Sequence, residues 1–85
     1  MAYNIYINPS ALKDLDALPD DQVEKILSHI EQLKLNPRPI GVQKLSDKEG
    51  YRIRSGSYRI LFEIHEKLKS VSIFRVKHRK DAYKK

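Results

Sequence analysis

The segment of residues 51–60 constrains the fold most, because apolar and basic side chains alternate along it with a period of two. It reads Tyr-Arg-Ile-Arg-Ser-Gly-Ser-Tyr-Arg-Ile. This alternation predicts two β-strands, and Gly56 supplies the positive φ that a tight hairpin turn needs. With residues 55 and 56 as the loop, Arg52 is expected directly opposite Arg59. The segment therefore predicts an antiparallel β-hairpin.

The predicted hairpin places Arg52, Arg54 and Arg59 on one face of the sheet. Like charges opposite each other destabilise an antiparallel pair, on the scale of the ~0.2–1 kcal/mol that a favourable pair contributes. Guanidinium groups held in this way suit an anion, and the expected anion is a nucleic-acid phosphate. The alternative is a solvated outer face on which these arginines pair with carboxylates such as Glu63.

The charge of the chain is distributed unevenly. The 85 residues carry a net charge of +6. Residues 1–42 hold four basic and six acidic side chains, whereas residues 43–85 hold thirteen basic and five acidic ones. A one-sided positive field steers polyanions to the second half of the chain. The alternative is a surface that only keeps the protein in solution.

Composition argues against several classes of protein. The chain has no cysteine, so neither a disulfide framework nor thiol chemistry is expected. Its three histidines are far apart and fit no metal-ligand motif, so neither a metal nor another cofactor is expected. No apolar run reaches the ~20 residues of a membrane span, and the start lacks the apolar core of a signal peptide. We expect one domain, residues 1–85, in the cytoplasm and without a membrane partner.

The start of the chain predicts a strand followed by a helix. Tyr3, Ile5 and Ile7 alternate with polar residues, as in a strand. Asn8 is a good N-cap and Pro9 suits the first helical position, so a helix is expected to begin there. The apolar residues with helical spacing are Ala11, Leu12, Leu15 and Leu18.

A second helix is expected after Pro19, where Asp21 and Glu24 have the spacing of a capping box. Its apolar stripe comprises Val23, Ile26, Leu27, Ile30 and Leu33. His29 follows the polar side of this helix and is expected to face solvent. The sequence Asn-Pro-Arg-Pro at residues 36–39 ends the helix. The two helices together predict a helical hairpin that covers one face of a sheet.

The second half of the chain predicts three strands, over residues 51–54, 57–65 and 70–77, with a turn at residues 66–69 and a short extended piece at residues 42–45. The element order is then β-α-α-β-β-β. We expect an α+β fold with a mainly antiparallel sheet, the helical hairpin on one face and the arginines on the other. The pattern leaves the strand order open.

The last strand is followed by a cluster of polar side chains. Residues 77–83 read Lys-His-Arg-Lys-Asp-Ala-Tyr. A histidine, an arginine and a tyrosine can supply a proton carrier, a phosphate ligand and a ring for base stacking. The alternative is a frayed basic tail. If the last strand lies beside the hairpin, its end brings this cluster close to Arg59.

Nearly the whole chain resembles RelE-type toxins of the RelE/ParE superfamily, the toxic components of type II toxin–antitoxin operons. The matching segments are Met1-Ala2-Tyr3, Ala11-Leu12-Lys13, Lys44-Leu45, Tyr51-Arg52-Ile53-Arg54, Gly56-Ser57-Tyr58-Arg59-Ile60 and Val76-Lys77-His78-Arg79-Lys80-Asp81-Ala82-Tyr83. The hairpin pattern Gly-x-Tyr-Arg and the ending His-Arg-x-Asp-x-Tyr together make the resemblance specific. It implies a RelE-like fold, which agrees with the element order above.

The resemblance implies a ribosome-dependent endoribonuclease that cleaves mRNA in the ribosomal A site and so inhibits translation. In such toxins the RNA 2′-hydroxyl attacks the adjacent phosphorus, which leaves a 2′,3′-cyclic phosphate and a 5′-hydroxyl. Arg59 matches the arginine that stabilises the transition-state phosphate, and Arg79 matches a second catalytic arginine near the leaving group. Both are expected outside the core. Tyr83 matches a tyrosine that stacks on the substrate base. The expected phosphate-binding residues are Arg52, Arg54, Lys77 and Lys80.

The general base of this reaction stays open. Arg52 and Arg54 stand where the best-known family members have lysine, and arginine keeps its proton up to a pH of about 12. His78 is the first candidate, since a free histidine titrates near pH ~6.5. Glu63 is the second, because it is expected on the same face as Arg59.

The resemblance also implies partners and leaves two other functions open. The partners are a cognate antitoxin from the same operon, acidic enough to cover the basic face, together with the ribosomal A site and mRNA. One alternative function is that of a ParE-type inhibitor of DNA gyrase, against which Arg79 and Tyr83 argue. The other is a non-catalytic or degenerate toxin that only binds its antitoxin or nucleic acid.

Overall fold

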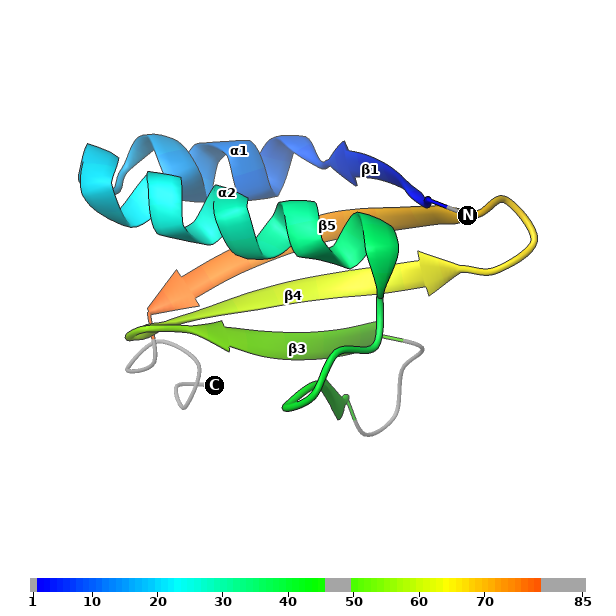
Figure 1. Ribbon diagram of the computed structural model, residues 1–85. Coiled ribbons are helices and arrows are strands. Elements are labelled where there is room, and N and C mark those ends of the chain that lie inside the picture. The colour runs from blue at the N-terminus through cyan, green and yellow to red at the C-terminus, as the bar shows by residue number, and fades with distance from the viewer. Residues whose placement is uncertain (1, 46–49, 79–85) are drawn as a thin grey trace.

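The computed structural model describes residues 2–45 and 50–78 and consists of two helices on one face of a five-stranded sheet (Figure 1). The elements are β1 (Asn4–Ile7), α1 (Pro9–Asp16), α2 (Asp20–Leu35), β2 (Gln43–Lys44), β3 (Gly50–Ser55), β4 (Tyr58–His65) and β5 (Ser70–His78). The strand order is β1-β5-β4-β3-β2. Because β1 runs parallel to β5 and the other neighbours are antiparallel, the expected α+β fold with a mainly antiparallel sheet is confirmed.

Local sequence signals account for both helices, with one correction. Asn8 has an extended backbone and Pro9 is the first residue of α1, as expected. The capping box predicted at Asp21 is wrong, because Pro19 is the N-cap and α2 begins at Asp20. Both aspartates therefore lie in the first turn, where their carboxylates face the positive end of the helix dipole.

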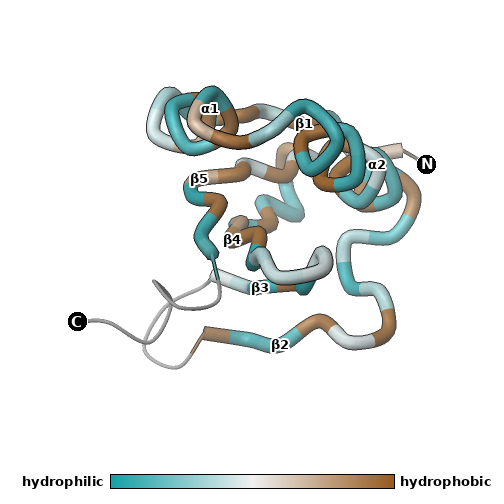
Figure 2. The backbone as a smooth tube through the Cα atoms, turned by 90° about the vertical axis from the view of Figure 1, so that its left-hand side faces the viewer, coloured by the Kyte–Doolittle hydropathy of each residue, from teal (hydrophilic) through white to brown (hydrophobic). Residues whose placement is uncertain are grey.

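The core lies between the helices and β4 and β5, whose hydrophobic stretches run beneath the helices in Figure 2. Its buried residues are Ala11, Leu15, Ile26, Ile30, Leu33, Ile60, Phe62, Val71, Ile73 and Val76. Two residues counted in the apolar stripes of the helices lie at their margins instead, since Leu12 is 48% exposed and Leu27 is 39% exposed. The contacts of the helices with the sheet are thus narrower than the sequence pattern predicts.

The hairpin has a different register from the predicted one. The loop consists of Gly56 and Ser57, so Arg54 lies opposite Arg59, and Arg52 does not. Gly56 has a φ of +61°. As the first residue of this loop, it stands where a type II′ turn places glycine. The prediction that Arg52 faces Arg59 is wrong, because the loop lies one residue later than predicted and the partner of Arg59 is therefore two residues further along β3. All three arginines still share one face.

A β-bulge in β5 determines which of its side chains reach the core. Ile60 lies opposite Val76, whereas Phe62 lies opposite Ile73, so Phe74 is an extra residue in β5. Both Ile73 and Val76 are buried although they are three residues apart. The bulge therefore shifts the alternation of β5, and the residues after it change faces relative to those before it.

Candidate phosphate-binding site

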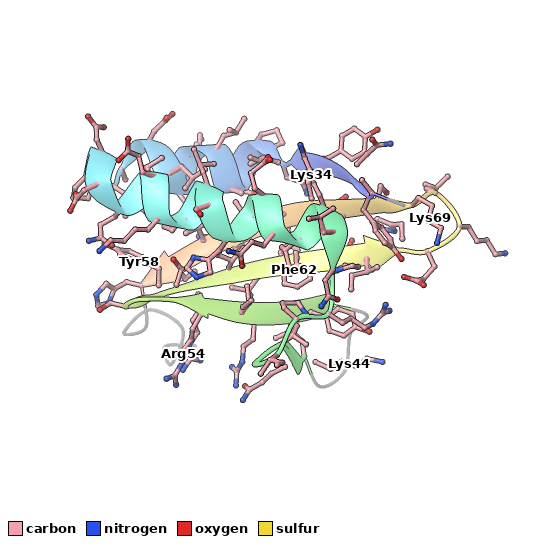
Figure 3. The ribbon with its side chains drawn as sticks, viewed as in Figure 1. Lys34, Lys44, Arg54, Tyr58, Phe62 and Lys69 are labelled. Atoms are coloured by element: carbon pink, nitrogen blue, oxygen red, sulfur yellow. The ribbon has the colours of Figure 1, made fainter. Side chains whose placement is uncertain are left out.

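Three cations form a row across the sheet near the end of the hairpin. Arg59 in β4 lies directly opposite Arg54 in β3 on one side and opposite Lys77 in β5 on the other. Directly opposed side chains have Cβ atoms about 4.5–5.5 Å apart. The adjacent Ile60 packs in the core under the helices, so alternation places the row on the opposite face. In Figure 3 Arg54 points away from the helices.

The bulge is what brings Lys77 into this row. With unbroken alternation from Val71 and Ile73, residue 77 would face the helices. The extra residue Phe74 reverses this, so that Lys77 comes beside Arg59 on the outer face. The expectation that the end of the last strand lies close to Arg59 is confirmed for Lys77. Arg79, Lys80 and Tyr83 lie outside the described residues.

A second row, one step along the strands, consists of Arg52, Leu61 and Arg75. The Nε of Arg52 donates a hydrogen bond of 2.9 Å to Oε1 of Gln43, and its Nη2 donates to the same oxygen. The sequence reasoning missed Gln43, which a pairing of β2 with β3 brings opposite Arg52. Because the amide is neutral, it orients the guanidinium without cancelling its charge.

Arg75 is neutralised, in contrast to Arg52. Its Nε donates to Oδ2 of Asp14 over 2.9 Å and its Nη2 to Oδ1 over 3.3 Å. The hydrogen bond to the carboxylate raises the pKa of Arg75. Oδ2 of Asp14 also accepts the backbone N–H of Val76 over 2.8 Å. Arg75 thus belongs to the contact between α1 and β5, and Arg52 remains available to an anion.

The predicted alternative, in which these arginines pair with carboxylates such as Glu63, is not what the structure shows for Arg52 and Arg54. Oε1 of Glu63 lies 3.5 Å from Nε2 of His65, toward the other end of β4. Within residues 2–45 and 50–78, neither Arg52 nor Arg54 forms an ion pair with a carboxylate.

Arg59 differs from its expected environment. It was expected outside the core, yet it is only 4% exposed. It lies in β4 between β3 and β5, with Arg54 and Lys77 directly opposite it. Its charge is therefore held in a less hydrated setting than that of the exposed Arg54.

A hollow of about 360 Å³ lies along the edge of β3 and connects the arginines with α2. Its lining residues are His29, Gln32, Pro39, Ile40, Gly41, Gln43, Arg52, Ile53, Arg54 and Arg59. This volume is at the lower end of the ~300–1,000 Å³ of small-ligand sites. The strand β2 pairs with Tyr51 and Arg52, so residues 53–55 of β3, beside the hollow, have no neighbouring strand on that side among the described residues.

His29 is a member of this site that the sequence reasoning placed wrongly. It is half-buried, and its Nδ1 lies 3.0 Å from Oγ of Ser55 in β3. The signal was present in the helical spacing, because His29 follows Ile26 by three residues and precedes Leu33 by four. It therefore lies on the face of α2 that packs against the sheet.

His78 lies on the other face of the sheet from the cationic row. It is opposite Tyr58, next to the core residue Ile60 in β4. The two rings contact edge to face, with centroids 5.2 Å apart and an interplanar angle of 89°. His78 was predicted to form one cluster with Lys77. The two residues are neighbours in the sequence, but their side chains lie on opposite faces of β5, so they do not form one cluster in space.

The described residues contain neither a group of histidines and carboxylates that could hold a metal ion nor a helix long and apolar enough to cross a membrane. The side chains described at the site offer guanidinium, ammonium, imidazole and amide groups. Such groups bind phosphate and stabilise negative charge that develops on it.

Comparisons with known proteins find similar toxins. Residues 5–83 match the family model described as the ParE toxin of the type II toxin–antitoxin system parDE. A protein of Methanocaldococcus jannaschii, described as a candidate toxin named RelE1, is 33% identical over 88 residues, which cover 99% of this chain and 98% of that protein.

Two solved structures share the fold. The toxin–antitoxin complex RelBE2 of Mycobacterium tuberculosis contains a chain with a TM-score of 0.83 and 26% identity, covering 93% of this chain and 100% of that one. The archaeal RelE–RelB complex of Pyrococcus horikoshii contains a chain with a TM-score of 0.82 and 29% identity, covering 93% of this chain and 97% of that one.

Proposed function

The chain belongs to the ParE toxin family of type II toxin–antitoxin systems, within the RelE/ParE superfamily, and we propose that it arrests translation by cleaving mRNA in the ribosomal A site. The observation that carries the proposal is the cationic row of Arg54, Arg59 and Lys77. Three cations at directly opposed positions repel one another, and a bound polyanion would relieve this repulsion. An RNA backbone is a polyanion of this kind.

The proposed reaction is transesterification within the RNA. The 2′-hydroxyl loses its proton and attacks the adjacent phosphorus, and the bond from phosphorus to the 5′-oxygen breaks. Negative charge builds up on the phosphoryl oxygens in the transition state. Preorganised cations aimed at such charge are often the largest catalytic contribution. Arg59 is proposed for this role because its burial strengthens its electrostatic effect.

The remaining roles follow from family resemblance and stay proposals. Arg79 is proposed to act near the leaving 5′-oxygen, and Tyr83 to stack on the substrate base. Arg52 and Lys77, with Lys80, are proposed to bind the flanking phosphates. Since a substrate held in place raises effective concentration, weak acid–base groups would suffice on the ribosome.

Expression in cells tests the proposal. Wild-type protein and the variant Arg79→Ala are induced, growth is followed, and the ends of an abundant mRNA are mapped by primer extension. We expect growth arrest and new ends inside translated codons with the wild type, and neither with the variant. The matched control is Lys67→Ala, which removes an exposed cation from the turn at the other end of the sheet. Arrest without new mRNA ends would contradict mRNA cleavage.

A second function is favoured by the description of the matching family, which names the parDE system. We propose inhibition of DNA gyrase as the alternative activity. A supercoiling assay with purified gyrase separates the two, because an mRNA-cleaving toxin leaves supercoiling unchanged. The residues Arg79 and Tyr83, which match catalytic positions of RelE-type toxins, weigh against this alternative.

An antitoxin is the proposed protein partner. The related structures of Mycobacterium tuberculosis and Pyrococcus horikoshii are toxin–antitoxin complexes. For this chain we propose a cognate antitoxin whose acidic segment covers the cationic row. Charge complementarity would accelerate the association and make its rate fall with added salt.

A further inference from the structure

The hollow beside β3 contains one group that the proposed reaction needs and the arginines cannot supply, a proton acceptor. We propose that this hollow binds one ribonucleotide of the substrate, with its phosphate on Arg54 and its ribose 2′-hydroxyl on Nε2 of His29. His29 then takes the 2′-hydroxyl proton. This inference rests on the proposed function and adds a base and a nucleotide subsite to it.

Hydrogen bonds fix the orientation and the tautomer of the His29 ring. Its Nδ1 lies 2.9 Å from the backbone oxygen of Lys25. A carbonyl oxygen only accepts hydrogen bonds, so Nδ1 is the nitrogen that carries the proton. In the neutral ring Nε2 therefore holds the lone pair. The Oγ of Ser55, 3.0 Å from the same Nδ1, ties the ring to β3.

The charged groups around the hollow have complementary roles. Arg52, Arg54 and Arg59 line it from β3 and β4, and Lys25 lies one turn before His29 on α2. Guanidinium groups keep their protons and bind phosphate through paired N–H donors. Arg54 is the exposed member of the three, so its guanidinium is the one a phosphate reaches first. His29 is the one histidine lining the hollow within the described part of the chain.

The far side of the hollow suits a nucleobase. A turn closed by a 3.1 Å hydrogen bond from the N–H of Val42 to the oxygen of Pro39 holds Ile40 fully exposed, at 103%. Gly41 in this turn has a φ of +93°, which favours glycine. The exposed apolar side chain offers a surface for the face of a base. The amides of Gln32 and Gln43 line the same hollow and can both donate and accept hydrogen bonds.

The chemical step is balanced without a metal or a co-reactant other than water. The proton of the 2′-hydroxyl moves to Nε2 of His29 while the 2′-oxygen forms a bond to phosphorus. The bond from phosphorus to the 5′-oxygen breaks, and this oxygen keeps the electron pair and takes a proton from water. The imidazolium of His29 returns its proton to the hydroxide or to solvent, and the products are a 2′,3′-cyclic phosphate and a 5′-hydroxyl.

The other histidines of the chain are placed less suitably. The ring of His78 packs edge to face against Tyr58, and His78 is not among the residues that line the hollow. The Nε2 of His65 lies 3.5 Å from Glu63, outside the hollow. His65→Gln is therefore a matched control for His29→Gln, because it removes the same group from a site without a proposed role.

The first test measures binding without ribosomes and so does not depend on cleavage. Nitrogen-15 spectra of the histidine rings are recorded while the RNA dinucleotide ApA, or its DNA counterpart, is added. We expect ApA to shift the Nε2 resonance of His29, and the DNA dinucleotide to bind at least about fivefold more weakly, because it lacks the 2′-hydroxyl. Equal binding of the two, or shifts confined to other histidines, would overturn the subsite.

The second test measures cleavage of mRNA on programmed ribosomes as a function of pH. We expect His29→Gln to lower the single-turnover rate by about 10²–10⁴-fold. We also expect it to abolish the fall in rate toward acid pH, while His65→Gln retains both the rate and the profile. Added imidazole should partly restore the rate of His29→Ala.

A second variant separates loss of the imidazole from a general effect of substitution on folding. Ser55→Ala removes the hydrogen bond to His29 but keeps the imidazole, so it should lower the rate less than His29→Gln at similar thermal stability. If the wild type cleaves mRNA and His29→Gln retains the wild-type rate and pH profile, the assignment of His29 is wrong and the proposed function stands. If the wild type leaves mRNA intact, the proposed function fails, and the dinucleotide titration alone decides whether the hollow is a ribonucleotide site.

Discussion

The guanidinium group of Arg59 lies between two other cations, Arg54 and Lys77, and is almost completely buried. Replacing it by alanine removes a charge that is held in position before substrate binds. We expect Arg59→Ala to lower mRNA cleavage on ribosomes by about 10²–10³-fold, the scale of losing one preorganised charge-stabilising group. Single-turnover cleavage measures the effect. Circular dichroism and urea unfolding are needed alongside, because a buried residue also contributes to packing; an unchanged cleavage rate in a folded variant contradicts the role.

At the opposite end of the sheet, Glu66 makes stability depend on pH. Its carboxylate accepts hydrogen bonds from Arg38 and from Tyr3, both 3.1 Å long, and these lower the pKa of Glu66 below its ordinary value of 4.5. A lowered pKa in the folded state means that the stabilisation is present above the ordinary value and is lost as the pH falls through the folded-state pKa.

The test compares melting temperatures between pH 6 and about pH 2.5. We expect the melting temperature of the wild type to fall toward acid pH by more than that of Glu66→Gln. The difference between the two proteins should be constant above pH 5 and shrink as the pH falls below 4.5. Parallel curves for the two proteins would show that Glu66 does not contribute this dependence.

At the scale of elements, Asp14 connects α1 with the part of β5 that lies beyond its pairing with β1. Its carboxylate accepts the backbone N–H of Val76 and the side chain of Arg75. We expect Asp14→Ala to lower the free energy of unfolding by about 1–3 kcal/mol, because it leaves a strand N–H without its acceptor. Urea unfolding measures this change. Asp16→Ala, an exposed aspartate of the same helix, is the matched control and should change stability by less than ~0.5 kcal/mol.

The elements themselves were predictable to different degrees. Alternation and helical spacing predicted both helices and the four main strands within one or two residues. The register of the hairpin was not predictable from the same alternation, because Ser55 and Gly56, or Gly56 and Ser57, can each be read as a two-residue loop. The pairing of Ser55 with Tyr58 decides for the second loop, in which Gly56 takes the first position with its positive φ.

The bulge in β5 was beyond an argument from alternation. The spacing of the apolar residues changes from two between Val71 and Ile73 to three between Ile73 and Val76. The same sequence is also compatible with a regular strand that has an exposed phenylalanine. Only the pairing with β4 shows that the phase changes. The sequence identified the arginines of the site but neither Gln43 nor His29, because the packing of β2 and α2 against β3 brings these two residues to the arginines.

At the scale of the whole molecule, the uneven charge of the sequence becomes a basic face on the side of the sheet away from the helices. Binding of single-stranded RNA to this face should weaken with salt, with a slope of log K against log salt of about −0.7 per phosphate contact. We expect Arg54→Ala to reduce the magnitude of this slope by about 0.7, and Lys67→Ala to leave it unchanged. Fluorescence anisotropy of a labelled RNA oligonucleotide across a salt series measures both; equal slopes for wild type and Arg54→Ala would remove Arg54 from the contact surface.

The central claim is that this toxin cuts mRNA by attack of the 2′-hydroxyl within the A-site codon. The most direct measurement is mass spectrometry of the RNA fragments formed when purified protein is added to ribosomes programmed with a defined mRNA. We expect fragments ending in a 2′,3′-cyclic phosphate and beginning with a 5′-hydroxyl, formed only with ribosomes and lost when the A-site nucleotide carries a 2′-deoxy group. Intact mRNA, or fragments that form equally well from the 2′-deoxy message, would contradict the claim.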